Sequence, residues 1–548
     1  MRRFDWRGLT ALLLGVVLVM GGLPFLKGGF YIGKHEGDTL HLADIVLRMA
    51  AGEWPHLDFM TPIGLMATAP IALFVKAGWG FGHAIFLAQL LVALVLLVPT
   101  VWVSARRVEP LTGRAAAWAY GALVMVLCLA LVHGEAEISI SVSMHYNRWA
   151  WAIAFLIVPL VVLDRSGEPT VTGRRLDGML IGAGMAALVL IKMTYAVALF
   201  PGLLIGLIAR RWWAEVAFAV IAGLVVLGIV TAFSGPAFWL AYLHDLAIVS
   251  ASEVRPMPGK DFGMIAAAPA YLGGTIALFA LVIFLRQAGR DAAGVALLFL
   301  APAFLYITYQ NYGNDPQWLA LAALIGLGLR PAAGLVNGFG WDLRKAMGLS
   351  AVALVCFGLP SALNLAYSPL RHLAQPTDKT RPLLSNLPQH GDVLTEQGRI
   401  YKVTQTVTAD GPGAPFALYR PLAGARDIAV LNGESLPECE TGGGFAAWFE
   451  TLARDLDGAG YAGKRIFVAD LFTQLWMYGP FEPIKGAAPW YYGGLPGIEH
   501  ADYVLVPECP LYEKARYGTL KSLKDGNYVL TEERRTPLYR LMRLATQP

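Results

Sequence analysis

Charged residues are scarce in this chain of 548 residues. Asp, Glu, Lys and Arg make up 15% of the sequence, whereas soluble globular proteins carry roughly 25%. Apolar residues make up 56%, and they gather in repeated runs of about 20 residues, the length that crosses a bilayer as a helix. The composition therefore excludes an ordinary soluble protein and predicts a polytopic membrane protein.

Strong net charge and abundant cysteine are also missing. A formal net charge of +4 gives no reason to expect a nucleic-acid partner. Of the four cysteines, Cys128 and Cys356 fall in apolar runs, and Cys439 and Cys509 fall in the polar C-terminal part. The latter two form either a disulfide, which an oxidising periplasm permits, or a pair of free buried thiols. The basic N-terminus and its apolar run lack a convincing small-residue cleavage site, so we interpret them as a retained first span.

Eleven apolar segments are expected to cross the membrane as helices. They cover residues 10–31, 82–104, 114–132, 149–163, 177–192, 195–209, 215–233, 264–285, 293–309, 317–330 and 346–367. Basic residues mark the cytoplasmic side of a membrane protein, and here they occupy every other connection. They are Arg2, Arg3, Arg7, Arg106, Arg107, Arg114, Arg165, Arg174, Arg175, Arg210, Arg211, Arg286, Arg290, Arg330, Arg344 and Lys345. This alternation places the N-terminus inside and the C-terminus outside.

Residues 1–367 are thus expected to form a transmembrane domain, with a first external loop over 32–81. In that loop TPIGLMATAPIALFVKAG is apolar but short and interrupted by proline, so we expect a helix in or near the outer membrane interface. Residues 368–548 are richer in Pro, Gly and charge, and we expect an extracytoplasmic α/β domain there. Within it GKRIFVADLFTQLW and ADYVLVPECP predict buried strands, and NYVLTEERRTPLYRLMRL predicts a hairpin.

Carboxylates, imidazoles and amides concentrate in the connections predicted to lie outside. The first loop contains KHEGDTLHLADIVLRMAAGEWPHLDFMTPIG, and the others cover 133–149, 238–262 and 310–318. The connections predicted to lie inside are short and hold mainly arginine. A reaction centre on the outer face of the membrane would produce this bias.

Acidic residues of the first two external loops are candidates for chemistry. Asp38 precedes an apolar stripe with helical spacing, so it is the N-cap of that helix, a catalytic carboxylate, or both. Asp58 is either a site residue or part of a turn built on Pro55. Glu135 and Glu137 would point the same way in an extended segment. They either share a divalent cation such as Mg²⁺ or Mn²⁺ or belong to a solvated loop.

Lys192 stands in ALVLIKMTYAVALF, where the predicted fifth and sixth spans meet. An ionisable residue there is costly, and a phosphate group at the membrane surface would compensate its charge. The alternative is a lysine that snorkels to the interface. Other polar residues of the outer loops are weaker candidates for substrate binding: His41, His145, Asn147, Arg148, Arg255, Asn311, Asn314 and Asp315. The last three lie in NYGNDP, which also predicts a plain turn.

The first loop has EGDT directly after the first span, then GEWPHLDF and an apolar helix. The second loop has an acidic pair and HYNRW, and many spans precede an external C-terminal domain. This arrangement resembles the GT-C superfamily of integral-membrane glycosyltransferases, which includes protein mannosyltransferases, aminoarabinose transferases and oligosaccharyltransferases. The resemblance covers order and spacing over roughly the first 200 residues.

By position, the resemblance implies that Asp38 is the catalytic carboxylate of the first loop and that Asp58 is a further acidic residue there. Two departures leave metal dependence open: Thr39 follows Asp38 where many members have Glu, and the second loop has Glu-x-Glu instead of Asp-x-Asp. The implied reaction is inverting transfer of a sugar from a polyprenyl-phosphate donor to a glycan, lipid or protein acceptor at a bacterial inner membrane. Asp38 would take the acceptor proton, and Lys192, an arginine or a metal would stabilise the phosphate.

Other functions stay open. The main alternative is a transporter or flippase for lipid-linked glycans or small molecules, although such proteins often place ionisable residues near the bilayer midplane and contain internal repeats. A polymerase or ligase that joins lipid-linked glycans would favour a long arginine-rich outer loop. A sensor is a fourth possibility, since residues 368–548 contain no nucleophile elbow, P-loop or metal motif.

Overall fold

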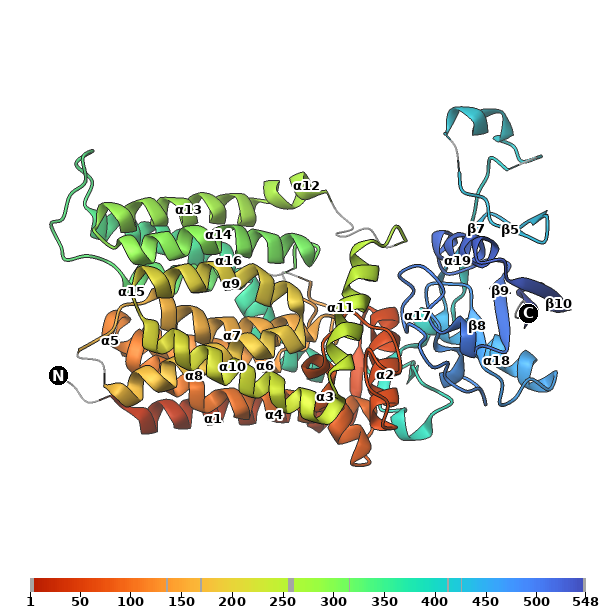
Figure 1. Cartoon of the computed structure of the whole chain (residues 1–548), viewed down its shortest axis with the longest axis horizontal. Helices are drawn as coiled ribbons and strands as arrows, with labels where there is room; N and C mark the ends of the chain where they lie inside the picture. Colours follow the sequence, from red (N-terminus) through yellow and green to blue (C-terminus); the bar gives the residue numbers. More distant parts are fainter. Residues whose placement is uncertain are drawn as a thin grey trace.

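The structure is a computed structural model that describes residues 4–134, 137–167, 170–254, 261–314, 316–411, 413–424 and 426–545. Long helices lie side by side in a bundle, and a region with most of the strands lies beyond one end of it (Figure 1). The short helices α2 (Glu36–Ala50), α3 (Leu65–Lys76) and α11 (Ala237–Ser250) lie at that same end (Figure 1). We call residues 380–545 the C-terminal region.

Each of the eleven apolar segments predicted from the sequence contains a helix. A helix bonds all its backbone groups internally, which apolar surroundings require. The helices are α1 (Trp6–Gly22), α4 (Phe81–Val103), α6 (Arg114–Leu129), α7 (His145–Val162), α8 (Val171–Ile191), α9 (Met193–Ala209), α10 (Trp213–Ser234), α13 (Pro269–Gln287), α14 (Asp291–Gln310), α15 (Trp318–Gly328) and α16 (Leu343–Ala374). All residues of α7 except Tyr146 are buried, so this helix lies inside the bundle.

Among the described residues, six helical stretches are long and apolar enough to cross a membrane. They are Trp6–Lys27, Phe81–Thr112, Trp213–Ser234, Pro269–Gln287, Asp291–Gln310 and Leu343–Ala374. Helices α6, α9 and α15 have 16, 17 and 11 residues, fewer than the roughly 20 of a perpendicular crossing. The structure thus supports a membrane-embedded protein, while the total of eleven spans stays a prediction.

Helix α3 occupies the apolar segment expected in the first external loop. It has 12 residues, too few to span a bilayer of roughly 30 Å, and Pro70 lies inside it. The segment is helical as predicted, and its position at a membrane interface stays a prediction. The other short helices of the bundle are α5 (Glu109–Thr112), which follows α4 through a π-helical turn at Ser104–Val108, and α12 (Phe262–Ala267).

Arginine-rich connections gather at the end of the bundle opposite the C-terminal region, where α5 and the N-terminus lie (Figure 1). Arg107 pairs with Asp177 at 2.5 Å, and both side chains are 1% exposed. Arg165 pairs with Glu215, and its guanidinium carbon lies 3.6 Å from the ring centroid of Trp212. These contacts fix the helix ends to one another. Which end of the bundle faces the cytoplasm stays a prediction.

The main sheet of the C-terminal region forms where the sequence predicts strands. Strands β8 (Ile466–Val468) and β9 (Tyr503–Pro507) are parallel neighbours, and β10 (Val529–Arg535) and β11 (Tyr539–Ala545) form the terminal hairpin, in the order β10-β11-β9-β8. The remaining strands and α-helices of the C-terminal region are β2 (Thr380–Pro382), β3 (Val393–Glu396), α17 (Gln397–Tyr401), β4 (Thr404–Val407), β5 (Val430–Leu431), β6 (Glu434–Ser435), β7 (Cys439–Gly443), α18 (Phe445–Gly458) and α19 (Glu513–Asp525). Helix α16 continues to Ala374, past the boundary expected after residue 367.

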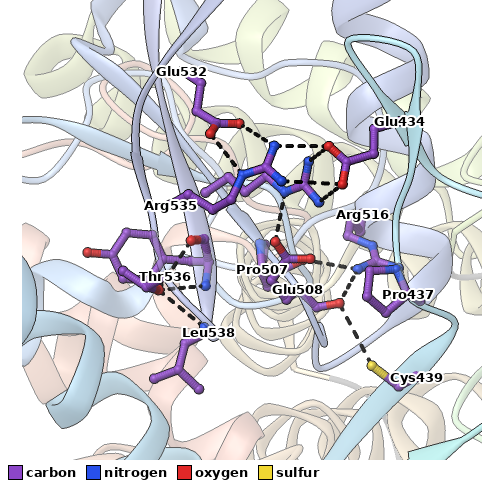
Figure 2. Close-up of polar contacts among 12 residues, drawn as sticks. Glu434, Pro437, Cys439, Pro507, Glu508, Arg516, Glu532, Arg535, Thr536 and Leu538 are labelled. Carbon is purple, nitrogen blue, oxygen red and sulfur yellow. Dashed lines mark hydrogen bonds and ion pairs between the residues drawn. The ribbon is translucent and has the colours of Figure 1, made fainter.

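An ion-pair network and a disulfide hold the segments around this sheet together. The Glu434 carboxylate accepts hydrogen bonds from Arg535 and from Arg540, at 2.9 and 2.6 Å, and Figure 2 shows Glu434 facing the Arg535 side chain. Cys439 and Cys509 form a disulfide, with their Cα atoms 5.3 Å apart. Of the two alternatives left open by the sequence, the structure has the disulfide, which agrees with an oxidising compartment.

The C-terminal region is joined to the bundle by contacts that the sequence did not predict. Strand β1 (Phe30–Ile32), which precedes α2, pairs in parallel with β3. The Asp392 carboxylate accepts backbone N–H bonds from Gly82 at 2.9 Å and from His83 at 2.8 Å, so it caps the N-terminus of α4. The first loop therefore lies fixed between the bundle and the C-terminal region.

Candidate functional site

A cavity of about 450 Å³ lies at the end of the bundle next to the C-terminal region. Its walls come from α2, from the break between α8 and α9, from α11, from the end of α14 and from the C-terminal region. Asp38, His41, Lys192 and Asn311 line it together, although Lys192 and Asn311 lie far along the chain from the other two. The structure therefore brings four of the predicted site residues to one cavity.

Asp38 is the third residue of α2, and its side chain is half-buried. The N-cap position belongs to His35, whose φ of 66° lies in the left-handed region, so Asp38 does not cap the helix. The Ser143 hydroxyl donates a hydrogen bond to the Asp38 carboxylate at 3.0 Å. A carboxylate offers about four lone-pair sites, so one hydroxyl leaves it able to bind a ligand.

A break between two helices places Lys192 at the cavity. Helix α8 ends immediately before Lys192 and α9 begins immediately after it. The Lys192 ammonium donates to Asn311 Oδ1 and lies 3.4 Å from Asn147 Oδ1. The ring centroid of Tyr146 is 5.6 Å from Lys192 Nζ. These neutral groups orient the ammonium and do not themselves cancel its charge, and the aromatic face adds a favourable electrostatic contact.

His41 follows Asp38 by three residues in α2, so the two side chains lie on one side of the helix. Its imidazole packs against Trp490 of the C-terminal region, with 5.6 Å between ring centroids. The part of the wall formed by α9 and α14 is also polar, because Thr194 donates to Gln310 Oε1 at 2.9 Å. The cavity thus combines a carboxylate, an imidazole, an ammonium and neutral hydrogen-bonding groups.

Five tyrosines of the lining were missed by sequence reasoning, and one of them is Tyr146, next to His145 in HYNRW. Tyr306, Tyr309 and Tyr312 come from α14 and the turn after it, and Tyr492 comes from the C-terminal region. The first three recur at intervals of three residues, a spacing that places side chains on one side of a helix and that reading the sequence could have used. Tyr492 stands in a segment with no comparable pattern.

Asp58 lies elsewhere, in the turn that the sequence offered as its alternative. Its carboxylate accepts the backbone N–H of Trp54 at 2.8 Å, and Lys485 Nζ lies 3.7 Å from it. Among the described residues it is not part of the cavity lining. These contacts explain Asp58 through the structure of the first loop, and a substrate-binding role stays a prediction.

Of three further candidates from HYNRW, one contacts Lys192 and two bond to backbone carbonyl groups. Asn147 contacts Lys192, as described above. Arg148 is 1% exposed and donates to the carbonyl groups of Val132 and Ala130, close after the end of α6. His145 Nε2 lies 2.8 Å from the Ala67 carbonyl oxygen of α3. In the described residues neither His145 nor Arg148 lines the cavity, and both act as fasteners between segments.

The acidic pair of the second loop is described only at Glu137. The Lys34 ammonium lies 2.7 Å from its carboxylate, and that hydrogen bond is the first cause that lowers the pKa of Glu137, to about 2. Glu135, Arg255 and Asp315 lie outside the described residues. Asn314, which precedes Asp315 in the chain, donates to the Asn311 carbonyl at 3.0 Å. No group of three His, Cys, Asp or Glu side chains suits a metal ion within the described residues, and metal binding stays a prediction.

Comparison with models of known protein families, with curated proteins and with solved structures gives no match to this chain. The function therefore has to be inferred from the chemistry of the cavity itself. A carboxylate on one wall and an ammonium on another suit a ligand that brings both a hydroxyl group and an anion.

Proposed function

We propose that this chain is an inverting membrane glycosyltransferase that moves a sugar from a polyprenyl-phosphate donor to an acceptor glycan, lipid or protein. The observation that carries the proposal is the meeting of Asp38 and Lys192 in one cavity at the end of a bundle of apolar helices. A general base and a phosphate-binding cation are the two charged groups that this reaction needs.

In the proposed reaction, the acceptor hydroxyl oxygen attacks the anomeric carbon of the donor sugar. The bond between that carbon and the phosphate oxygen breaks, and polyprenyl phosphate leaves as an anion. Asp38 takes the acceptor proton, a task for which a carboxylate within hydrogen-bond reach suffices. The hydroxyl of Ser143 fixes the carboxylate while it leaves further lone pairs toward the cavity.

Lys192 stabilises the phosphate in the proposed reaction. Charge grows on the phosphate oxygen as the sugar departs, and a cation already in place stabilises that charge without reorganisation. The amide oxygens of Asn147 and Asn311 hold the ammonium group at the cavity wall. Hydroxyl groups of the lining tyrosines add neutral donors for phosphate or sugar oxygens.

The side of the cavity that faces the outer surface of the bundle suits a lipid-linked substrate. Val197 of α9 and Tyr306 of α14 line the cavity and yet are 61% and 48% exposed. Phe200, one turn after Val197, is 54% exposed. A bilayer around the bundle would cover these apolar side chains, so a polyprenyl chain can lie along them while its phosphate and sugar stay in the cavity.

The decisive experiment uses the full chain in proteoliposomes with a panel of polyprenyl-phosphate sugars. We expect wild-type protein to release polyprenyl phosphate from one of them, and Asp38→Asn to be slower by about 100-fold or more, the usual contribution of a general base. Asp291→Asn is the matched control, because that aspartate is 74% exposed and, among the described residues, is not part of the cavity lining. Addition of EDTA in the same assay tests the predicted divalent cation.

Two results would count against the proposal. Equal rates for wild type and Asp38→Asn would remove Asp38 from the chemistry. Absence of turnover with every donor, together with movement of a lipid-linked glycan across the membrane, would favour the transporter instead.

A further inference from the structure

The first turn of α2, which carries Asp38, lacks the usual helix-end support. The first four backbone N–H groups of a helix have no partner within it, and a side chain at the N-cap commonly supplies one. Here the N-cap residue His35 makes no such bond. A helix start of this kind frays unless tertiary contacts hold it.

The C-terminal region supplies those contacts through Glu36. Glu36 is 6% exposed and lies two residues before Asp38. Its carboxylate accepts hydrogen bonds from Arg399 of α17, through Nε and through Nη2 at 3.0 Å, and from Thr395 Oγ1 of β3 at 3.3 Å. Burial raises the pKa of Glu36, but the hydrogen bond and charge of Arg399, a backbone hydrogen bond and the Thr395 hydroxyl together lower it below its ordinary value. A two-pronged arginine–carboxylate pair fixes direction as well as distance.

Two further contacts hold the same turn. A Cβ added to Gly37 would lie 2.4 Å from Phe472 Cζ, so the C-terminal region packs directly on the backbone of this turn. On the other flank, Ser143 donates to Asp38. The turn is thus held from both sides, and Arg399 provides the only ion pair to α2 from outside the first loop among the described residues.

We propose that Arg399 is a positioning residue for the site: through Glu36 it fixes the first turn of α2 and with it the direction of the Asp38 carboxylate into the cavity. The C-terminal region then completes the active site instead of merely accompanying it. This inference rests on the proposed function for its catalytic consequence, but its structural consequence can be measured without any substrate.

The test compares Arg399→Ala and Arg399→Lys with Arg465→Ala in the full chain. Arg465 is a matched control, since its side chain is 40% exposed, as is that of Arg399, and it pairs with Asp502 within the C-terminal region. Hydrogen–deuterium exchange reports on residues 36–42. We expect Arg399→Ala to lose about tenfold protection there, Arg399→Lys to lose less, and Arg465→Ala to match wild type.

The second readout is turnover of the polyprenyl-phosphate donor. A displaced base lowers kcat, and a misplacement of about 1 Å costs up to roughly 100-fold, whereas the KM for the donor should change little because Lys192 is not on α2. Arg399→Lys should recover part of kcat. A general loss of folded protein would lower the active fraction of enzyme without this recovery, and it would also speed exchange outside α2.

The outcomes separate the two proposals. Faster exchange in α2 of Arg399→Ala with no turnover by wild type would support the Glu36–Arg399 contact and overturn the glycosyltransferase. Active wild type, with unchanged exchange and kcat in Arg399→Ala, would overturn the positioning role alone. If Arg399→Ala does not fold, the same comparison between Arg399→Lys and Arg465→Ala decides, because unchanged exchange and kcat in Arg399→Lys would count against the role.

Discussion

Asp38 at the cavity end of the helical bundle is held differently from the carboxylates of the arginine-rich end. At the arginine-rich end, Asp177 is paired with Arg107 and Glu215 with Arg165, and these carboxylates are almost fully buried. At the other end, the Asp38 carboxylate accepts a hydrogen bond from the Ser143 hydroxyl and, among the described residues, forms no ion pair.

This difference teaches how to separate structural from functional charges. A buried ion pair satisfies both partners, and its work is to fix the helices that carry them. A charge beside a cavity, held by neutral hydroxyl or amide groups, keeps its capacity to bind a ligand. Asp38 is of the second kind, and Lys192 lines the same cavity next to the amide oxygens of Asn147 and Asn311.

Loss of a buried ion pair should have the largest effect on the stability of the protein. Arg107→Ala removes the nearest cation from the buried Asp177, which keeps the indole N–H of Trp102 at 2.9 Å and Arg106 at 3.7 Å, so we expect a cost near the lower end of the about 3–5 kcal/mol of a broken buried pair. We expect a large fall in the thermal unfolding temperature of the protein in detergent micelles. The control is Arg286→Ala, whose partner Asp291 is 4.0 Å away and 74% exposed, and which should cost less than about 1 kcal/mol. If both variants unfold at one temperature, the arginine-rich end is not held by its ion pairs.

Removal of a charge beside the cavity should leave the fold intact and weaken ligand binding. Lys192→Met keeps the length of the side chain but removes the charge, and a hydrogen bond from a charged group contributes about 1.5–3 kcal/mol. The dissociation constant for a short-chain polyprenyl phosphate should therefore rise about 10- to 100-fold, measured by calorimetry. Exposed Lys76 of α3 is the control. An unchanged affinity in Lys192→Met, with wild-type affinity in Lys76→Met, would show that Lys192 does not bind phosphate.

Much of the secondary structure could be predicted from local patterns in the sequence. The apolar segments became helices, and the segments around β8, β9 and the terminal hairpin became strands, because length, hydrophobicity and alternation are local properties. The pairing of β1 with β3 and the cap of α4 by Asp392 left no such signal. Strands of three or four residues and single carboxylates that act across more than 300 positions have no period to detect.

The sequence singled out Asp38 by its place in the first loop and Lys192 by the cost of burying a charge. Lys192 stood out because an ammonium in apolar sequence needs a reason. Arg148 and His145 were weaker candidates from the sequence, and the structure bonds them to backbone carbonyls. The sequence does not say where a side chain points, so it cannot separate a residue that fastens two segments from one that faces a ligand.

The interface between α2 and the C-terminal region should depend on pH through Asp44. This residue is 1% exposed and accepts a hydrogen bond from Gln474 at 3.2 Å. Burial raises the pKa of Asp44 from its ordinary 3.8 to about 6, although Arg48 opposes the shift. The folded state thus binds the proton more tightly than the unfolded state. The stabilisation is complete below the ordinary pKa and is lost as the pH rises through 6.

Between pH 5 and pH 7.5 this linkage amounts to about 1.4 kcal/mol, a factor of about ten in local opening. Hydrogen–deuterium exchange of residues 40–48 and 470–476, corrected for intrinsic rates, should be that much slower at pH 5. Asp44→Asn cannot ionise and should show equal protection at both values. Protection that increases toward pH 7.5 in wild type would show that the buried Asp44 carboxyl does not favour its protonated form.

The smallest effect is expected from the helix caps, which also distinguish the two ends. Asp5 caps α1 from the adjacent residue, through the backbone N–H of Gly8 at 2.9 Å, whereas Asp392 caps α4 from the C-terminal region. Loss of an aspartate cap costs about 1 kcal/mol in either case. Asp5→Ala should loosen only the first turn of α1. Asp392→Ala should loosen both the first turn of α4 and β3, because the cap and the pairing of β1 with β3 meet at Asp392 and Val393.

Hydrogen–deuterium exchange of residues 81–85 and 393–396 measures both segments at once. If Asp392→Ala speeds exchange in α4 alone, the cap is a local fastener like that of Asp5, and the C-terminal region is held by its other contacts. If both segments loosen together, the cavity end is a cooperative unit built from distant parts of the chain. Cooperative loosening is the result expected of an end that must keep Asp38 aligned, since one carboxylate at a cavity cannot be held by its own short segment alone.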